Sequence, residues 1–283
     1  MKEHQKYKEW SYQPVCYRRE DRMKIVVCIK QVPDTNEVRL DPKTGTLIRD
    51  GVPSIINPDD KSGLEAALLL KDQHGAHVTV LTMGPQQADL ALREALAMGA
   101  DEAILLTDRA FAGADTWATS LTLAKALDEL DYDLIITGRQ AIDGDTAQVG
   151  PELAEHLQIP HVSYAKDIKK EEGNLIVKRM FEDGYHLIRV KMPCLVTALS
   201  DMNTPRYMNV KGIYDAYREK TVKTMTFDDL KIEREALGLK GSPTKVKRSF
   251  TKGAKTAGKL YKDLDEKEAA RVIVEKMKEK FII

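Results

Sequence analysis

The stretch Asp133-Leu-Ile-Ile-Thr-Gly-Arg-Gln-Ala-Ile-Asp-Gly-Asp-Thr-Ala-Gln-Val-Gly-Pro151 decides the fold of this chain. It opens with the apolar run Leu134 to Thr137, which is typical of a strand buried on both faces. A small polar loop follows, and from Thr146 the apolar residues are spaced for one face of a helix. A strand, a small loop and a helix start present backbone N–H groups to phosphate in α/β proteins. The stretch therefore predicts a nucleotide site, although an ordinary strand–turn–helix connection has the same pattern.

The same alternation of strand-like and helix-like segments extends toward the N-terminus. Apolar runs at 25–29, 78–83 and 103–106 predict strands, and they alternate with amphipathic segments that predict helices. The first helix is expected to begin at Asn57 as N-cap with Pro58 at its first position, and to end at Gly75. Strands that alternate with helices indicate right-handed crossovers, so we expect a Rossmann-like, doubly wound and mostly parallel sheet.

After Pro160 the pattern changes to strands joined by short turns, at 162–168, 174–181, 186–190 and 195–197. We interpret all four as antiparallel additions to the sheet. Beyond Pro205 the chain becomes polar and basic, with a final amphipathic helix near 265–281. The expected domains are an extension at 1–22, a nucleotide-binding α/β domain at 23–205 and a partner-docking C-terminal arm at 206–283.

Composition excludes several classes of function. The 283 residues include 44 basic and 44 acidic side chains, so the net charge is zero and gives no reason to bind nucleic acid. No apolar run reaches the roughly 20 residues that span a bilayer, so no membrane insertion is expected. The three cysteines have no CxxC spacing, which fits a reducing cytoplasm.

No catalytic or metal-binding residues are expected. The sequence has no Walker A lysine motif, no GxGxxG after a strand, no HExxH and no GxSxG. Its six histidines share no predicted face. The chain alone is therefore expected to be a binding subunit.

A ligand in a doubly wound sheet lies beyond the carboxyl ends of the strands. Four segments reach this edge: Cys28 after the first strand, Met83-Gly84-Pro85 after the second, the helix start at Asn57 to Asp60, and Gly138 to Gly150. Small residues there permit close backbone approach, and Thr146 and Gln148 can donate to phosphate oxygens. The candidate cofactor-binding residues are Cys28, Asn57, Pro58, Asp59, Asp60, Met83, Gly138, Gln140, Asp143, Gly144, Asp145, Thr146, Ala147, Gln148, Val149 and Gly150.

From Met23 to Tyr207 the chain resembles the β subunit of electron transfer flavoproteins. The matching motifs are Cys28-Ile-Lys-Gln-Val-Pro-Asp-Thr35, Asn57-Pro-Asp-Asp60, Ala95-Leu-Ala-Met-Gly-Ala-Asp101, Gly138-Arg-Gln-Ala-Ile-Asp-Gly-Asp-Thr146 and Asn203-Thr-Pro-Arg-Tyr207. The resemblance implies an adenine-nucleotide-binding α/β domain and an obligate heterodimer with an FAD-bearing α subunit, which the C-terminal arm wraps.

The resemblance also implies a choice of cofactor. In simpler members the β-subunit nucleotide is a structural AMP, whereas in the bifurcating branch it is a second FAD. The loop from Asp143 to Gly150 is similar to the bifurcating branch, so FAD is expected. The complex would accept electrons from NADH and pass them to ferredoxin or flavodoxin and to an acyl-CoA dehydrogenase.

The resemblance maps a docking segment for the dehydrogenase onto Arg206, Tyr207 and Val210, with Val210 as the apolar anchor. Val210 packed inside the subunit is the alternative. Two other functions stay open at this stage. One is a non-bifurcating carrier with AMP, and the other is a nucleotide-sensing or stress-type α/β binding protein without a redox role.

Overall fold

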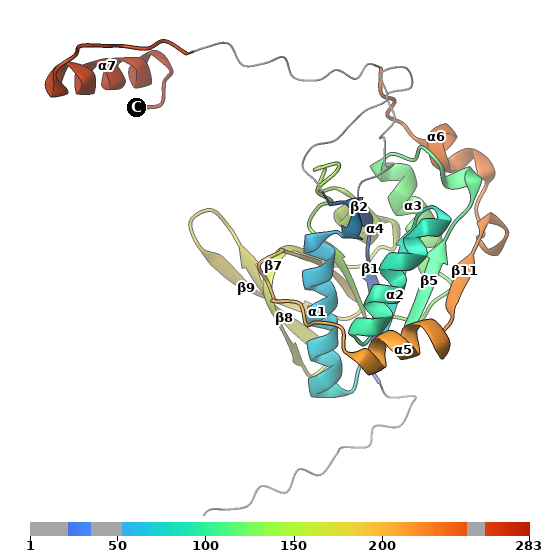
Figure 1. Cartoon of the computed structure of the whole chain (residues 1–283). Coiled ribbons are helices and arrows are strands. Elements are labelled where there is room, and N and C mark those ends of the chain that lie inside the picture. The colour runs from blue at the N-terminus through green and yellow to red at the C-terminus, as the bar shows by residue number, and fades with distance from the viewer. Residues whose placement is uncertain (1–21, 35–52, 248–257) are drawn as a thin grey trace, which may run out of the picture. The chain divides into compact units, whose positions relative to one another are not determined.

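The computed structural model describes residues 22–34, 53–247 and 258–283 (Figure 1). The expected extension, apart from Arg22, lies outside these ranges. The chain divides into two compact units, of which the first ends at Val246 and the second spans Lys247–Ile283. Each unit is described by itself.

The first unit is built on a mixed sheet that has nine strands within the described residues. In order across the sheet they are β11 (Val222–Met225), β5 (Glu102–Leu106), β4 (His77–Met83), β1 (Lys24–Cys28), β6 (Leu134–Gly138), β10 (Cys194–Ala198), β7 (His161–Glu171), β8 (Asn174–Met180) and β9 (Tyr185–Lys191). Every neighbouring pair from β11 to β7 is parallel, and β7, β8 and β9 are antiparallel. A second sheet pairs β2 (Gln31–Pro33) with β3 (Ser54–Ile56). The mostly parallel α/β fold is confirmed.

Helices cover both faces of the parallel part of the sheet. The helices of this unit are α1 (Pro58–His74), α2 (Asp89–Met98), α3 (Thr116–Leu127), α4 (Val149–His156), α5 (Val210–Arg218) and α6 (Gly238–Gly241). Single 3₁₀ turns lie at η2 (Gln86–Ala88), η3 (Arg109–Phe111), η4 (Phe227–Asp229) and η5 (Arg234–Ala236). α1 and α2 pack on one face, α3 and α4 on the other, and α5 packs against α2 (Figure 1).

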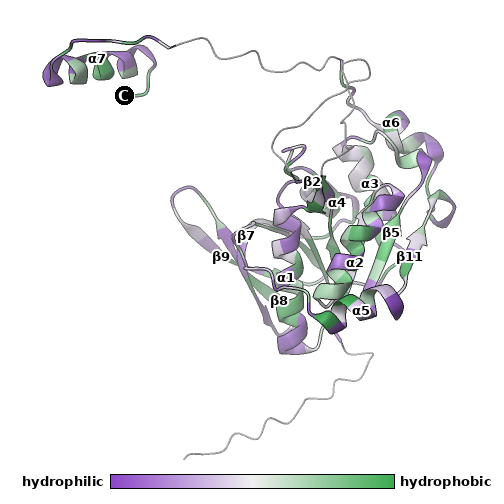
Figure 2. Cartoon of the chain, in the orientation of Figure 1, coloured by the Kyte–Doolittle hydropathy of each residue, from purple (hydrophilic) through white to green (hydrophobic). Residues whose placement is uncertain are grey.

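The alternation of side chains along β1 shows why the sheet is buried on both faces. Ile25 and Val27 belong to the apolar core under α1 and α2, whereas Val26 and Cys28 belong to the core under α3 and α4. A strand with two buried faces has no polar side, as the continuous apolar runs predict. The outer strand β9 is mostly exposed, and hydrophilic residues are more frequent along it than along the central strands (Figure 2).

Helix α1 begins and ends where the sequence predicts, and Asn57 is its N-cap residue. Pro58 occupies the first position, and Gly75 ends the helix in the left-handed region with φ of 67°. The side chain of Asn57 makes no capping hydrogen bond. It is fully buried and binds a neighbouring loop instead, as described below.

Two expectations about topology differ from the structure. β10 and β7 were expected to be antiparallel additions, but β10 runs parallel to both β6 and β7, so the parallel sheet continues past residue 160. Residues 206–246, which we assigned to the arm, lie in the first unit and add β11 to its sheet edge. Buried apolar residues that are far apart in sequence, Ala216, Met225 and Leu237, hold this segment in place.

The second unit contains helix α7 (Glu266–Glu279). Asp265 caps it by accepting hydrogen bonds from Lys267 N and Glu268 N at 2.9 and 2.8 Å. None of its residues is buried, and Ile273 is 59 % exposed. Within the described residues no helix is long and apolar enough to cross a membrane.

Candidate functional site

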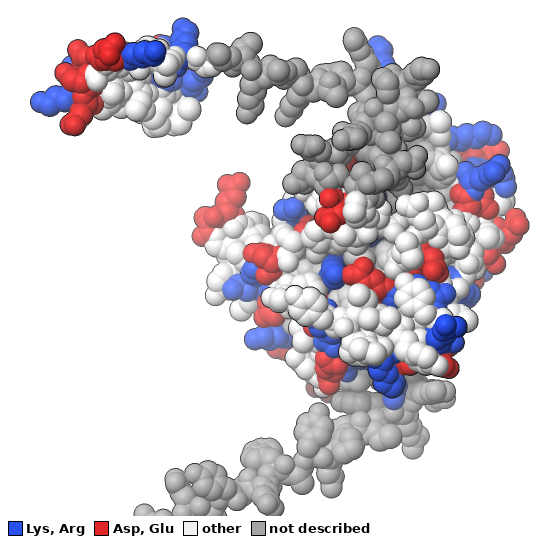
Figure 3. Space-filling model, viewed as in Figure 1, with Lys and Arg blue, Asp and Glu red and all other residues white. Residues whose placement is uncertain are grey.

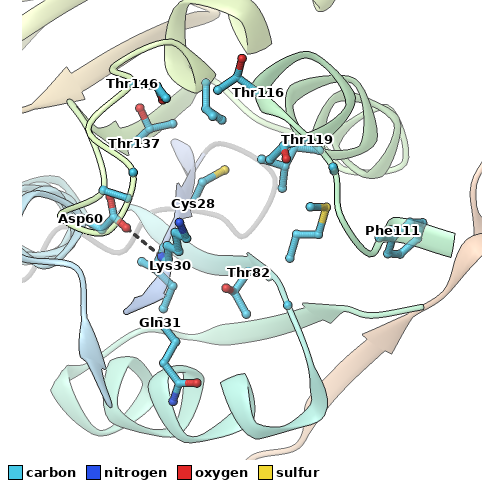
Figure 4. Close-up of a pocket in the computed structure, with 18 of the residues that line it drawn as sticks. Cys28, Lys30, Gln31, Asp60, Thr82, Phe111, Thr116, Thr119, Thr137 and Thr146 are labelled. Atoms are coloured by element: carbon cyan, nitrogen blue, oxygen red, sulfur yellow. Dashed lines mark hydrogen bonds between the residues drawn. The ribbon is translucent and has the colours of Figure 1, made fainter. Parts of the chain in front are cut away.

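A cavity of about 960 Å³ lies at the carboxyl ends of the central parallel strands (Figure 4). Cys28, Met83 and Gly138 mark the ends of β1, β4 and β6, and all three line it. The chain order places β4 and β6 on opposite sides of β1, so the strand order reverses here. This is the position where doubly wound sheets bind ligands.

The loop after β6 forms one wall of the cavity. Of the candidate residues, the cavity brings together Cys28, Asp60, Met83, Gly138, Gln140, Gly144, Asp145, Thr146, Ala147, Gln148, Val149 and Gly150. The helix predicted from Thr146 begins only at Val149. Asp145 and Ala147 have positive φ of 52° and 54°, which interrupts a helix and turns backbone groups of the loop.

Asn57, Pro58, Asp59 and Asp143 do not line the cavity. Instead, Asn57 holds the loop, because its Nδ2 donates to Gln140 O at 2.8 Å and its Oδ1 accepts from Ile142 N at 3.1 Å. Asp59 accepts a long hydrogen bond from Gln140 N at 3.4 Å. The start of α1 therefore positions the loop from behind.

Asp60 completes this arrangement from the floor of the cavity. Its carboxylate accepts from Lys30 N at 2.7 Å and from Gly138 N at 2.9 Å, so it joins the chain just after β1 to the end of β6 (Figure 4). Burial raises the pKa of Asp60 to about 7, although these hydrogen bonds and one from Asn57 oppose the shift. The group is a buried link between strands.

The acidic residues of the loop are paired. Asp143 accepts from Lys30 Nζ at 2.6 Å, and Asp145 accepts from Gln140 Nε2 at 2.8 Å. These contacts neutralise Asp143 and occupy an oxygen of Asp145. Two carboxylates beside a predicted phosphate site are therefore compatible with an anionic ligand.

Two glycines let the loop and helix α4 approach the sheet closely. A Cβ at Gly138 would lie 2.2 Å from Asp60 Oδ1 and 2.9 Å from Asp60 N. A Cβ at Gly150 would lie 2.7 Å from Thr137 Oγ1 and 2.7 Å from Thr197 Cγ2. By contrast, a Cβ at Gly144 would meet nothing within 4 Å. The space beside Gly144 is open.

The opposite wall of the cavity was missed by the sequence analysis. It comes from the chain after β5 and the first turn of α3. Its members are Thr107, Asp108, Arg109, Phe111, Ala112, Gly113, Ala114, Asp115, Thr116 and Thr119, joined by Thr244. The signal was present, because β5 was predicted to end at Leu106 and its carboxyl end belongs to the same sheet edge.

The lining carries hydroxyl groups but no nucleophile. Thr82, Thr116, Thr119, Thr137 and Thr146 surround the cavity (Figure 4). Within the described part of the chain, the buried Thr82 Oγ1 and Arg139 Nε have no hydrogen-bond partner. Burial raises the pKa of the Cys28 thiol to about 12, and Asp60 adds to the shift, so the thiol stays protonated.

The expected docking residues lie away from the cavity and differ from one another. Tyr207 and Val210 are 97 % and 86 % exposed. Arg206 instead turns back to α1, where its Nη2 lies 2.9 Å from Glu65 Oε1 and 2.8 Å from Asp72 Oδ2. These hydrogen bonds, chiefly those with Glu65, raise the pKa of Arg206. Arg206 therefore anchors the segment, and uncharged side chains gather over α5 beyond it (Figure 3).

Known proteins are similar to this chain over most of its length. A family model described as the electron transfer flavoprotein domain matches residues 44–230. A protein of Clostridium acetobutylicum named electron transfer flavoprotein subunit beta is 59 % identical over 261 residues, which cover 92 % of this chain and 100 % of that protein.

Two further relatives carry names that refer to enzyme complexes. Subunit CarD of the caffeyl-CoA reductase–Etf complex of Acetobacterium woodii is 56 % identical, with 92 % of this chain and 100 % of that protein covered. The acryloyl-CoA reductase electron transfer subunit gamma of Anaerotignum propionicum is 48 % identical with the same coverage, 92 % and 100 %.

Within the described residues no cluster of side chains could hold a metal ion.

Proposed function

The chain belongs to the electron transfer flavoprotein family as a β subunit, and from this premise we propose that it holds FAD in the cavity of a bifurcating complex. β subunits of this family pair with an α subunit. Bound in this cavity, FAD would supply the redox chemistry, a two-electron oxidation of NADH followed by single-electron transfers. Family membership rules out the stress-type binding protein that the sequence left open.

The observation that carries the choice of FAD over AMP is the open volume beside the loop. The cavity of about 960 Å³ is near the upper end of the range of about 300–1,000 Å³ for ligand pockets. A mononucleotide would leave much of it empty. Gly144 lines the cavity, and nothing lies within 4 Å of a Cβ at this residue, so the wall is not crowded there.

Residues of the loop, of the start of α4 and of β4 suit a diphosphate and the polar groups attached to it. Thr146 and Gln148 offer side-chain donors, and the backbone N–H groups at the start of α4 offer more, next to the positive end of the helix dipole. Thr82 has a buried hydroxyl without a partner within the described residues, which a bound polar group would satisfy.

The chain itself would tune and orient the cofactor without acid–base chemistry. Arg139 lines the cavity, and its Nε lies 3.4 Å from Asp59 Oδ2, so one positive charge is held at the wall. It would favour an anionic cofactor. Of the segment from Lys30 to Arg39, where we place NADH approach, Lys30 is fixed by Asp143, and the residues beyond Asp34 lie outside the described ranges.

The acceptors follow from the names of the relatives. Two relatives are named as parts of caffeyl-CoA and acryloyl-CoA reductase systems. We therefore assign an acyl-CoA dehydrogenase or reductase as the high-potential acceptor of this complex. Ferredoxin or flavodoxin would be the low-potential acceptor, because bifurcation needs a second, more reducing outlet.

Counting nucleotides in the purified heterodimer tests the function. The complex is denatured, and the released FAD and AMP are separated and quantified. Two FAD molecules per heterodimer are expected. One FAD together with one AMP would contradict bifurcation and leave a simple carrier, whereas no adenine nucleotide beyond the α-subunit flavin would contradict the cavity assignment.

A cavity-filling variant locates the site. Thr146→Trp places a large ring in the cavity and is expected to remove the β-subunit nucleotide while the α-subunit flavin stays. Thr224→Trp, at an exposed position on β11 outside the cavity lining, is the control and should keep both. Equal nucleotide content in the two variants would mean that the cofactor lies elsewhere.

A further inference from the structure

The last part of the first unit is tied to the start of α3 by one carboxylate. Asp115 Oδ2 accepts from Thr244 N at 2.9 Å and from Thr244 Oγ1 at 2.7 Å. The same side chain caps α3, because its Oδ1 accepts from Ala118 N at 3.0 Å. Ser242 adds a further tie, since its Oγ accepts from Asp115 N at 2.9 Å.

This tie forms part of the cavity wall. Asp115, Thr116, Thr119 and Thr244 all line the cavity. Thr116 also reaches the other wall, where its Oγ1 donates to Gln148 Oε1 at 3.1 Å. A displacement of Thr244 would therefore open the wall directly and release one constraint on the first turn of α3.

The carboxylate of Asp115 is suited to strong hydrogen bonds with Thr244. Burial alone would raise the pKa of Asp115, but hydrogen bonds from Thr244, Ala118 and Ser242 lower it. Asp115 is therefore ionised at neutral pH, and hydrogen bonds to an ionised acceptor are stronger than those between neutral groups.

The tie also stands at the beginning of the arm. Val246, two residues after Thr244, ends the first unit, and the chain continues into the unit that contains α7. The exposed apolar side chains of α7 and of the chain end, such as Ile273 and Phe281, are available to a partner subunit. Thr244 is therefore the last residue in the cavity lining before the chain passes into the second unit.

We propose that Asp115 and Thr244 are positioning residues, which form a latch that couples engagement of the arm by the α subunit to retention of the nucleotide in the β subunit. The latch rests on the proposed cofactor site and arm. Because coupling between two binding events is reciprocal, a bound nucleotide also strengthens the heterodimer. The latch gives the complex a means to keep the nucleotide only when it is assembled.

The first test removes the latch hydroxyl with Thr244→Val in the full-length heterodimer. The control is Thr226→Val, because Thr226 N and Oγ1 bind Asp229 Oδ2 in the same way, at 2.8 and 3.0 Å, and Thr226 does not line the cavity. The nucleotide retained per heterodimer is measured after timed gel filtration. Release from Thr244→Val should be about tenfold faster than from wild type, and Thr226→Val should match wild type.

The second test loosens the arm while the latch stays intact. About six Gly and Ser residues are inserted between Val246 and Lys247, which adds slack to the chain. The heterodimer should form, but nucleotide release should be as fast as in Thr244→Val, and the two changes together should add little. A structural role of Thr244 alone would leave the insertion variant at the wild-type rate.

The outcomes separate the latch from the proposed function. If wild-type heterodimer carries a β-subunit nucleotide and both Thr244→Val and the insertion release it at the wild-type rate, the latch is wrong and the cofactor site stands. If wild type carries no such nucleotide, the proposed function itself is wrong. Faster release in both variants supports the latch.

Discussion

The loop at 138–150 and the segment at 206–218, which is expected to dock a partner, are anchored to the same helix, yet the first lines a cavity and the second has exposed side chains. The loop is held by Asn57 and Asp60 at the start of α1 and lines a cavity. The docking segment is held by Glu65 and Asp72, one to three turns later, and exposes Val210.

In the proposed function, one rigid helix supports two kinds of recognition. A ligand that is enclosed needs backbone groups held in a fixed place, so the anchors of the loop are buried polar groups. A partner protein that docks from outside needs exposed apolar side chains on a firm base. Glu65, 6 % exposed at its side chain, provides that base through Arg206.

The largest expected effect comes from Gly138→Ala. The new Cβ would lie 2.2 Å from Asp60 Oδ1 and 2.8 Å from Asp59 Cβ, so the start of α1 must move away from the loop. We expect a loss of about 3 kcal/mol or more in the free energy of unfolding. Thermal unfolding of the heterodimer would show it.

Gly144→Ala is the matched control in the same loop. Nothing lies within 4 Å of its Cβ position, so stability should stay within about 0.5 kcal/mol of wild type. Equal destabilisation by the two alanines would show that close packing against α1 does not fix the loop.

Asp60→Asn is expected to cost about 2 kcal/mol, because the amide nitrogen cannot accept from Lys30 N or Gly138 N, whereas either carboxyl oxygen can accept even when the group is protonated. The pH dependence has a definite sign. The pKa of Asp60 is raised from 3.8 to about 7, so the folded state binds the proton more tightly than the unfolded state. The contribution of protonated Asp60 to the stability of the fold is therefore complete below about pH 4 and is lost as pH rises through about 7.

The penalty of Asp60→Asn should therefore shrink as pH rises from about 5 to about 8, since asparagine does not titrate. Denaturant titrations of wild type and variant across this range measure it. A penalty that stays constant with pH would show that Asp60 is ionised throughout and that burial does not control it.

Arg206→Ala tests the other anchor. It leaves the buried Glu65 carboxylate without its strongest partner, which should cost about 1–3 kcal/mol and loosen the docking segment. Chemical denaturation should show the loss of stability, and the rate of electron transfer to the dehydrogenase should change as well. Lys211→Ala is the control, because the exposed Lys211 pairs with Asp215 one turn further along α5, and it should leave stability unchanged.

The smallest effect on stability is expected for Val210→Asp. Val210 is 86 % exposed at the first position of α5, where an acidic side chain suits the helix dipole, so stability should change by less than about 0.5 kcal/mol. Electron transfer to the acyl-CoA acceptor should nevertheless fall about tenfold if Val210 anchors the contact. Leu90→Asp, an exposed site in the first turn of α2, is the control and should transfer electrons at the wild-type rate.

Much of the fold could be predicted because its signals are local. The run Leu134 to Thr137 became β6, and Pro58 and Gly75 bound α1 as expected. The direction of β10 could not be predicted, since its apolar run is the same for a parallel or antiparallel neighbour. The segment after residue 205 looked too polar to pack, and only the fold shows that Met225 and Leu237 reach the core.

The sequence indicated the sheet edge at which the candidate site lies, but several of the expected residues make other contacts in the structure. Asn57 and Asp59 were expected to touch the ligand, but their side chains hold the loop. Arg206 was expected to meet a partner, but Glu65 holds it. A single sequence shows which polar residues reach one edge of a sheet, and it does not show which of them face each other.

The sequence by itself determined the family, the α/β class and the sheet edge at which the cavity lies, because repeated apolar runs and small loop residues act over short distances. Tertiary structure decided which residues line the cavity, that the wall after β5 closes it, and that Thr244 is tied to Asp115 across more than a hundred residues. The physical reason is that hydrogen bonds and burial between distant segments depend on where the chain returns. Local patterning does not carry that information.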